Sequence, residues 1–347
     1  MSGQSTIERY NELEREMRSR LSVPEVQAFE TTTFDRVGWP CRVEREADLV
    51  RYADWCCHPG ANQYFVPGAV LPTQCASLSF SGVERDLLQE VSRRTAAMTA
   101  KLGREVHPLL NHLAQIGPFR IIMEIRRRAR VSALSILEIG AGSGYLSTML
   151  AMTGNQIATT DNAQGLYLWQ SLLFRECFGS RFSDWIEGQP TCTPDVQLFP
   201  WWDYLGMRHK CPIKADIVIS NNNLGEMNPN ALAYTLTLAR EVLDQSPIGL
   251  FLFTCAGTPM HQEINSIQEA FRQRGFKPLK TSPFWVFAPT GRAIFSSLLD
   301  FGKQIPVYAQ TGGENLISAR EVVLATKKTL PVDMDFVSYI GVFRFFS

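Results

Sequence analysis

The chain has 347 residues, with 34 basic and 34 acidic side chains and a formal net charge of zero. This length suits one large domain plus an accessory one, and a neutral chain creates no field that favours nucleic acid or an anionic membrane. No apolar run approaches the ~20 residues needed to span a bilayer, and the polar start lacks a signal-peptide pattern. We therefore expect a cytoplasmic protein that binds neither nucleic acid nor membranes.

Two conspicuous groups of side chains are interpreted as structural. The eight cysteines are scattered without a C-x-x-C pair or the spacing of a zinc or iron–sulfur site, so we expect reduced thiols and assign no metal ligands. Five arginines between positions 120 and 130 share a predicted helix with an isoleucine stripe. A solvated or salt-bridged helix face explains them better than a phosphate-binding patch.

Residues 1–105 are predicted to form a helical extension ahead of the main domain. Apolar side chains recur at helical spacing from Ile7 to Leu21, and further helices are predicted over 47–57 and 84–102. The loop 58–68 between the second and third of these helices is rich in turn formers and aromatics. It is a candidate lid over a substrate, with an oligomer contact or simple packing as the alternatives.

The main domain, residues 106–347, contains the most informative stretch of the chain, an apolar strand that runs into a glycine-rich turn. Glu138 lies two residues before the first glycine of a G-x-G-x-G pattern. A nicotinamide-binding fingerprint would place its third glycine at position 145, which is Tyr, so the spacing disfavours a diphosphate. The glycines of the turn are Gly140, Gly142 and Gly144.

A second strand, Gln156–Thr160, is predicted after the helix that follows the turn, and it ends at Asp161. Asp161 comes about twenty residues beyond the glycines, where α/β nucleotide folds place a carboxylate against ribose hydroxyls. Its alternative role is to cap the helix that follows. Both roles are compatible.

The same alternation of strands and helices continues through the rest of the domain. Near-continuous apolar strands that alternate with helices indicate a doubly wound α/β fold with a mostly parallel sheet. Two of the helices begin with a capping residue and proline, at Asn228-Pro229 and Thr258-Pro259. The further strands are predicted over 195–202, 215–220 and 248–255.

An antiparallel pair is predicted at the C-terminal edge of the sheet, from residues 276–286 and 336–346. The roughly fifty residues between them, an insertion at about 287–335, would overhang the ligand edge. Its aromatic content favours a small organic acceptor over a polymer. The hydrophobic last strand is also compatible with burial in a homodimer.

The strand and glycine turn resemble motif I of class I S-adenosylmethionine-dependent methyltransferases. The resemblance implies a Rossmann-like sheet with an antiparallel C-terminal edge, and S-adenosyl-L-methionine as cofactor. It also implies that Glu138 orients the methionine ammonium. Trp202 and Asp203 are candidates for adenine contacts, with core packing and a turn as the alternative. The predicted cofactor-binding residues are Glu138, Gly140, Ala141, Gly142, Gly144, Asp161, Asn162, Trp202, Asp203, Asn221 and Asn222.

Two further stretches, Thr159–Gln170 and Ser220–Pro229 with its continuation to Tyr234, resemble a bacterial group of sugar O-methyltransferases. The resemblance covers about residues 105–275 and implies a small-molecule hydroxyl as the methyl acceptor. That group often carries a histidine after the fourth strand, where this chain has Asn222 and Asn223. The departure argues against a histidine-based mechanism at this position and weakens the sugar assignment.

Transfer of a methyl group to a hydroxyl requires a group that removes the hydroxyl proton. Glu226 follows the fourth strand at the ligand edge and is the first candidate, although the dipole of the next helix would also favour a carboxylate there. His261 is the second candidate. His58, His107 and His112 are weaker alternatives.

Three other functions remain open at this stage. Methylation at carbon or nitrogen is an alternative, because the sequence does not identify the acceptor atom. A nicotinamide-dependent oxidoreductase and a non-catalytic protein that binds S-adenosylmethionine are the rivals from other classes.

Overall fold

The computed structural model describes residues 5–21, 42–45, 48–49, 79–108, 111–188, 194–207, 211–221, 223–254, 262–281, 284–292 and 317–318. Several predicted features lie outside these residues. They are His58 with the loop 58–68, Asn222, His261, most of the helix 47–57, the segment 336–346 and most of the insertion.

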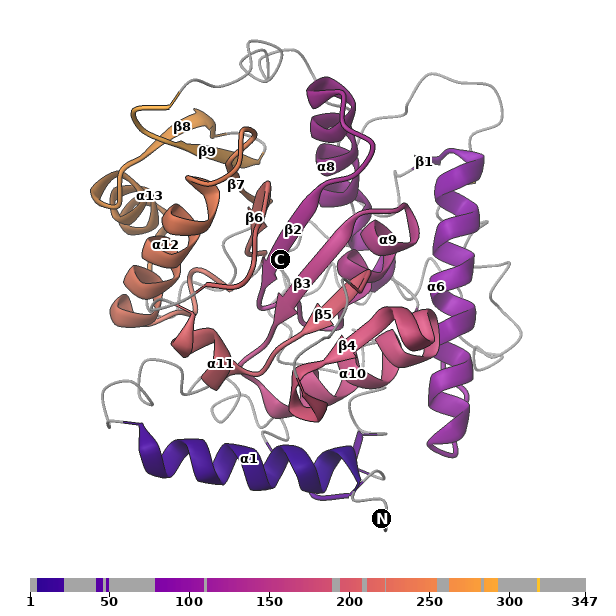
Figure 1. Cartoon of the computed structure of the whole chain (residues 1–347). Coiled ribbons are helices and arrows are strands. Elements are labelled where there is room, and N and C mark those ends of the chain that lie inside the picture. Colours follow the sequence, from indigo (N-terminus) through magenta and orange to yellow (C-terminus); the bar gives the residue numbers. More distant parts are fainter. Residues whose placement is uncertain are drawn as a thin grey trace, which may run out of the picture.

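An eight-stranded sheet forms the centre of the described structure (Figure 1). Its strands are β2 (Ser135–Ile139), β3 (Gln156–Thr160), β4 (Phe182–Asp184), β5 (Val196–Leu198), β6 (Ile217–Ile219), β7 (Leu250–Phe253), β8 (Phe276–Lys280) and β9 (Trp285–Pro289). Their order is β4-β5-β3-β2-β6-β7-β9-β8, and β9 runs antiparallel to both of its neighbours. The predicted Rossmann-like sheet, mostly parallel with an antiparallel C-terminal edge, is confirmed.

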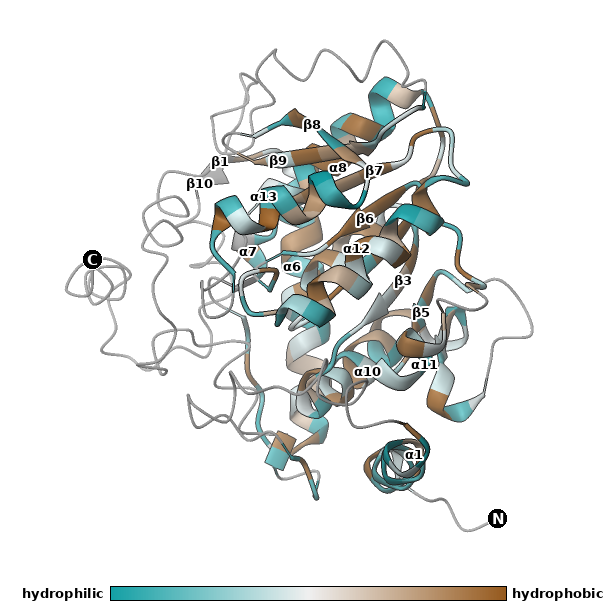
Figure 2. Cartoon of the chain, turned by 90° about the vertical axis from the view of Figure 1, so that its left-hand side faces the viewer, coloured by the Kyte–Doolittle hydropathy of each residue, from teal (hydrophilic) through white to brown (hydrophobic). Residues whose placement is uncertain are grey.

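Helices cover both faces of this sheet, as expected for buried parallel strands. One face carries α6 (Gly82–Lys101), α7 (Asn111–Ala114), α8 (Ile116–Ala129), α9 (Tyr145–Met152) and α10 (Gln164–Phe178). The other carries α12 (Pro229–Leu243) and α13 (Ile264–Gln273), and α11 (Trp201–Gly206) contributes side chains to the core clusters of both faces. Figure 2 shows brown, apolar strands in the middle of the molecule and teal, polar stretches on the outer helices.

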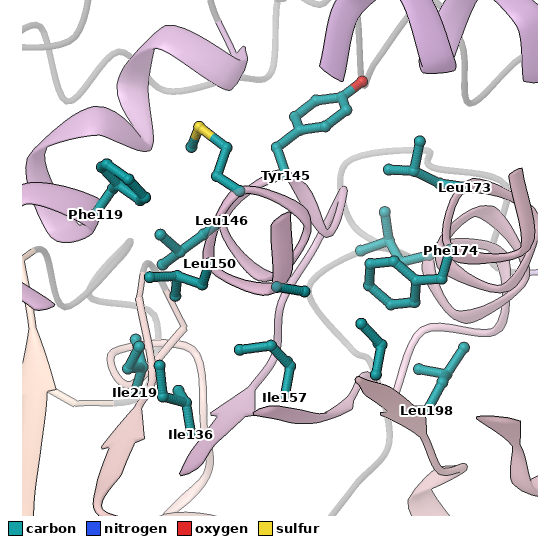
Figure 3. Packing of buried hydrophobic residues seen from close by; sticks show 14 of the residues in the cluster. Phe119, Ile136, Tyr145, Leu146, Leu150, Ile157, Leu173, Phe174, Leu198 and Ile219 are labelled. Carbon is teal, nitrogen blue, oxygen red and sulfur yellow. The ribbon is translucent and has the colours of Figure 1, made fainter. Parts of the chain in front are cut away.

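The core divides into two clusters because successive strand residues point to opposite faces. Ile136 and Ile157 pack with Leu146 and Leu150 of α9, whereas Leu137 and Ala158 belong to the cluster on the other face. Figure 3 shows the first cluster, with strand side chains directed at α9 and α10. Each large apolar side chain buried in this way stabilises the fold by roughly 1.5–3 kcal/mol.

Helix caps fix the start of three helices. Ser5 and Glu8 form a capping box at the start of α1 (Thr6–Arg20), and Ser81 and Glu84 form another at α6. The predicted cap at Asn228 is confirmed, since its side chain accepts from two backbone N–H groups in the first turn of α12. These bonds satisfy donors that the helix itself leaves unpaired.

The antiparallel edge differs from the prediction in its second strand. The strand between β7 and β8 is β9, which follows β8 directly along the chain, and not the segment 336–346. A short hairpin supplies the antiparallel neighbour without a long insertion, so the predicted boundary at 287 falls inside β9. Within the described residues, a separate two-stranded pair joins β1 (Ser79–Phe80) to β10 (Ile317–Ser318).

Two other predicted boundaries are wrong. The strand predicted over 195–202 ends at Leu198, and Trp201 and Trp202 lie in the first turn of α11, because Pro200 suits the position before a helix. The helix predicted from Pro259 begins at Ile264, with Glu263 as its cap. Two short 3₁₀ helices, η2 (Gly179–Arg181) and η3 (Trp185–Glu187), flank β4.

Candidate functional site at the carboxyl edge of the sheet

The order of the strands reverses between β2 and β6. From β2 the chain turns to β3 and β5 on one side of the sheet, and then crosses to β6 and β7 on the other. In open α/β sheets, ligands bind outside the carboxyl ends of the strands at such a switch point. The candidate site is therefore the edge where the glycine turn follows β2 and the asparagine-rich segment follows β6.

Close packing explains two glycines of the turn. Gly140, Gly142 and Gly144 all have positive φ angles, of 70°, 58° and 72°. A Cβ on Gly140 would lie 1.8 Å from the side-chain nitrogen of Asn223, and one on Gly144 would lie 2.9 Å from the ring of Phe174. No described atom lies within 4 Å of a Cβ on Gly142, so this glycine faces the open side of the turn.

Two side chains hold both polar groups of Gly142. Its N–H donates to the Asp161 carboxylate over 2.9 Å, and its carbonyl accepts from the Gln170 amide over 2.8 Å. Asp161 also accepts from the backbone N–H of Ala163 over 3.0 Å. The alternative role predicted for Asp161, that of capping the next helix, is wrong, because the N-cap of α10 is Ala163 and no side chain caps this helix. The turn is thus fixed in place by groups from β3 and α10.

Glu138 is buried behind the turn and interacts with the first turn of α9. Its carboxylate accepts from the Ser147 hydroxyl over 2.5 Å and from the Ser147 backbone N–H. Burial raises the pKa of Glu138 to about 7, an effect that the Ser147 hydroxyl reduces and the charge on Asp161 reinforces. The start of α9 therefore has an acidic group where a helix dipole favours negative charge.

Asp161 is the second buried acid at this edge. Burial raises the pKa of Asp161 to about 6, although three backbone N–H groups, from Ala163, Gly142 and Asn162, oppose the shift. Among the described residues, neither Asp161 nor Glu138 forms an ion pair with a lysine, arginine or histidine. Two acidic groups are thus enclosed together without a counterion from the described part of the chain.

Three aromatic rings, those of Trp202, Tyr10 and Tyr167, pack together near the start of α11, and we call this group the aromatic wall. The ring of Trp202 lies 5.0 Å from that of Tyr10, which in turn lies 4.9 Å from that of Tyr167 on α10. Asp203 is half-buried, and burial raises the pKa of its carboxyl to about 6. The structure therefore places the predicted Trp202 and Asp203 on the side of the edge next to β3 and β5.

Two asparagines after β6, Asn221 and Asn223, form hydrogen bonds to the ends of neighbouring strands. Asn223 donates to the carbonyl of Ile139 over 2.8 Å and accepts from Ser220, so it joins the ends of β2 and β6. Asn221 accepts from the backbone N–H of Thr254 over 2.8 Å, which fixes its amide orientation because that N–H can only donate. The Asn221 amide nitrogen then points the other way and has no partner among the described residues.

Of the two predicted catalytic residues, Glu226 belongs to the described part of the chain. Glu226 is half-buried in the turn 223–227, where its backbone N–H donates to the carbonyl of Asn223 over 3.1 Å. The carbonyl of Gly225 accepts from the N–H of Gln262, the residue after His261. The turn that carries Glu226 is therefore in contact with the described residue that follows His261 in the chain, whereas His261 itself lies outside the described residues.

Two of the three alternative histidines, His107 and His112, belong to the described residues and lie on the side of α6 and α7. His107 shares a hydrogen bond of 2.9 Å with Ser92 of α6. His112 is fully buried 6.3 Å from the ring of Tyr145, and burial, with the charge of His107, lowers its pKa to about 3. A ring with so low a pKa is a weak base at neutral pH, so His112 is better explained as a packed side chain.

Sequence reasoning missed four residues of this edge. Ser147 had a detectable signal, since it is the third residue of the helix after the glycine turn, where an N–H lacks an intrahelical partner. Gln170 and Asn223 reach the turn from other elements, and Tyr10 reaches the wall from α1, so only tertiary packing brings them there.

The fold and this edge define a class of protein: a Rossmann-like α/β domain with the sheet of class I methyltransferases and an acid-flanked glycine turn at its switch point. No family model and no curated protein matches the chain. The comparison with solved structures finds chains that are similar over part of this one.

Three of these structures are S-adenosylmethionine-dependent enzymes by name. Magnesium protoporphyrin IX methyltransferase from Synechocystis PCC 6803, with S-adenosylmethionine bound, is 13% identical over 59% of this chain and 98% of its own, with a TM-score of 0.37. A TehB-like methyltransferase from Corynebacterium glutamicum is 14% identical over 58% and 98%, with a TM-score of 0.35. A methyltransferase from Clostridium acetobutylicum is 10% identical over 51% and 92%, with a TM-score of 0.37. At such identities and scores, no residue role, ligand or substrate carries over to this chain.

The described residues contain neither a helix suited to crossing a membrane nor a group of three or more histidine, cysteine or acidic side chains that could bind a metal ion. The described Cys177 and Cys211 are free thiols.

Proposed function

We propose that this chain is an S-adenosylmethionine-dependent methyltransferase that acts on a small molecule, with a hydroxyl of a sugar or secondary metabolite as the acceptor. One observation carries the proposal: two buried acids, Glu138 and Asp161, flank the glycine turn and lack a cationic partner among the described residues. A buried carboxylate without a counterion is costly, and a cationic ligand offsets that cost.

The charge of the ligand distinguishes the two leading cofactor types. S-adenosylmethionine brings a sulfonium and an ammonium group, both attracted by ionised Glu138 and Asp161. The diphosphate of a nicotinamide cofactor would face the same two acids, and like charges repel strongly in an enclosed site. Tyr145 at the third-glycine position argues in the same direction, because its buried ring occupies the start of α9.

The residues at the edge fit the parts of this cofactor. Glu138 lies nearest the start of α9 and suits the methionine ammonium, while Asp161 has lone pairs left for ribose hydroxyls beyond the N–H groups that it already accepts from. Trp202 and Asp203 suit the purine. Asn221 offers its amide N–H₂ to an oxygen of cofactor or acceptor. Gly142 lets the ligand approach the backbone on its open side.

The acceptor hydroxyl requires alignment and removal of a proton. The cofactor supplies a methyl group already activated as a sulfonium, so the protein must position the acceptor oxygen in line with it and exclude water. The new O–CH₃ bond forms as the S–CH₃ bond breaks, and the hydroxyl proton leaves to a base. We assign Glu226 as this base and keep His261 as the second candidate, because both follow strands at the ligand edge.

Calorimetry of the full chain with S-adenosylhomocysteine, S-adenosylmethionine and NAD tests the cofactor. We expect heat with the first two and none with NAD; uptake of NAD alone would overturn the proposal.

A panel of hydroxyl, amine and carbon acceptors, read by mass spectrometry for an added methyl group, then tests the reaction. Methylation of amines or carbon alone would refute the hydroxyl assignment, and binding without any turnover would favour a non-catalytic protein. A homodimer and a cytoplasmic location stay predictions, tested by light scattering and cell fractionation.

A further inference from the structure

The N-terminal helix α1 packs against the carboxyl edge of the sheet. Figure 1 shows α1, in indigo, beside α10 and α11. Glu14 of α1 accepts from the indole N–H of Trp201 over 3.1 Å, and Asn11 accepts from the amide of Gln164 at the start of α10. These partners all follow β3 or β5, so α1 covers the half of the edge that holds Asp161, Trp202 and Asp203.

Tyr10 is the residue of α1 that lies deepest in this half. Its side chain is fully buried, and its ring packs against those of Trp202 and Tyr167. Its hydroxyl has no hydrogen-bond partner among the described residues. Glu14 and Asp161 both lie near enough to act on it electrostatically.

The Tyr10 hydroxyl can donate a hydrogen bond, but it has no acceptor among the described residues. Burial, with the nearby charge of Glu14, raises the pKa of Tyr10 well above its ordinary value of 10, so the group keeps its proton. A buried hydroxyl left unpaired destabilises the protein that contains it. Buried hydroxyls are normally paired, and those that are not call for an explanation such as a ligand.

We infer that Tyr10 belongs to the cofactor site, and that its hydroxyl donates to an oxygen or nitrogen of the adenosyl group bound between Asp161 and Trp202. The inference rests on the proposed function and extends it, because it assigns α1 of the N-terminal extension to the cofactor and not to the acceptor.

A pair of tyrosine variants separates this role from packing. Tyr10→Phe removes an unpaired hydroxyl and keeps the ring, so the thermal midpoint of the ligand-free protein should stay the same or rise. Its affinity for S-adenosylhomocysteine should fall about tenfold, the loss expected for one hydrogen bond worth about 1.4 kcal/mol. Tyr204→Phe is the control, because the buried Tyr204 hydroxyl already bonds to Thr235 over 3.0 Å. That variant should lower the thermal midpoint and leave the affinity unchanged.

Calorimetry and thermal unfolding of the full chain give the outcomes. Unchanged affinity in Tyr10→Phe, with binding intact in the wild type, overturns the role of Tyr10 and leaves the proposed function standing. That result would mean that a buried water satisfies the hydroxyl. Wild-type protein that binds neither S-adenosylmethionine nor S-adenosylhomocysteine refutes both. Equal losses of affinity in the two tyrosine variants would also refute the inference, because they would indicate a general effect of packing.

Discussion

Two of the glutamates buried in the described part of the chain, Glu84 and Glu138, differ in how their charge is balanced. Between α6 and α8, Glu84 accepts two hydrogen bonds from Arg120, of 2.6 and 2.9 Å. Burial alone would raise the pKa of Glu84, but the bonds from Arg120 and Ser81 bring it below its ordinary value. At the glycine turn, Ser147 is the hydrogen-bond donor to Glu138 among the described residues, and burial raises the pKa of Glu138 to about 7. The Glu84 carboxylate has its counterion within the described chain, whereas we propose that a cationic ligand supplies the counterion of Glu138.

The difference shows how a structural carboxylate can be told from a binding one. A carboxylate that serves the fold has its counterion in the chain, because an isolated buried charge costs several kcal/mol. A carboxylate that binds a cationic ligand lacks a counterion in the chain, because the ligand supplies the opposite charge. Four measurements test this distinction.

Breaking the internal pair should have the largest effect. Arg120→Met leaves Glu84 buried without its counterion, which we expect to lower the free energy of unfolding by about 3–5 kcal/mol. The change in the free energy of unfolding is measured by urea denaturation. The control is Arg272→Met, which removes an exposed pair with Glu269 and should cost less than about 0.5 kcal/mol. Equal losses in the two variants would show that burial does not distinguish the pairs.

Neutralising the other glutamate should act on binding and not on stability. Glu138→Gln removes the charge that attracts the cofactor, so its affinity for S-adenosylmethionine should fall by at least about 30-fold, or about 2 kcal/mol. The thermal midpoint near pH 8 should hold or rise, since no charge is then buried. Glu187→Gln, at an exposed pair with Arg175, is the matched control and should change neither quantity. A destabilised variant with normal affinity would make Glu138 a structural residue like Glu84.

The pH dependence should differ between ligand-free and ligand-bound protein. Because burial raises the pKa values of Glu138 and Asp161 to about 7 and 6, the folded protein holds protons that the unfolded chain releases near pH 4 to 5. Stability of the ligand-free protein should therefore fall as pH rises from about 4 through 7. Affinity for S-adenosylmethionine should rise over the same range, by up to about tenfold per pH unit for each acid that ionises on binding, because the cation favours the ionised acids. Calorimetry in buffers of different ionisation enthalpy would detect the protons that are released on binding. Binding without proton release at pH 6 would contradict the proposed ionisation of the two acids.

Removal of the Ser147 hydroxyl, which donates to the Glu138 carboxylate, should have the smallest effect of the four changes. Ser147→Ala raises the pKa of Glu138 further and should weaken binding at pH 7 about fivefold, or about 1 kcal/mol. The loss should disappear at pH 9, where Glu138 is ionised in both proteins. Ser171→Ala, which removes a comparable donor to the buried Asp184, should lower stability without this change in the pH profile of binding. A loss of affinity that is independent of pH would indicate a displaced turn instead.

Local sequence signals were sufficient for the elements that frame the site. The apolar run at 136–139, the glycines after it and Asp161 at the end of β3 are close together in the chain, and each pattern reports a local preference of the backbone. The cap at Asn228 is local in the same sense. The second edge strand was predicted wrongly because several apolar segments have the same periodicity, and pattern alone does not choose among them.

The sequence by itself determined that strands and helices alternate here, that a tight glycine turn follows the first strand of the sheet, and that acids lie on both sides of it. Only the tertiary structure decided that Gln170 and Asn223 hold this turn, that α1 brings Tyr10 to the same edge, and that Arg120 neutralises Glu84 but no described cation neutralises Glu138. The reason is physical: periodicity and capping depend on neighbours in the chain, whereas the pairing of a buried charge depends on which distant segments pack against it.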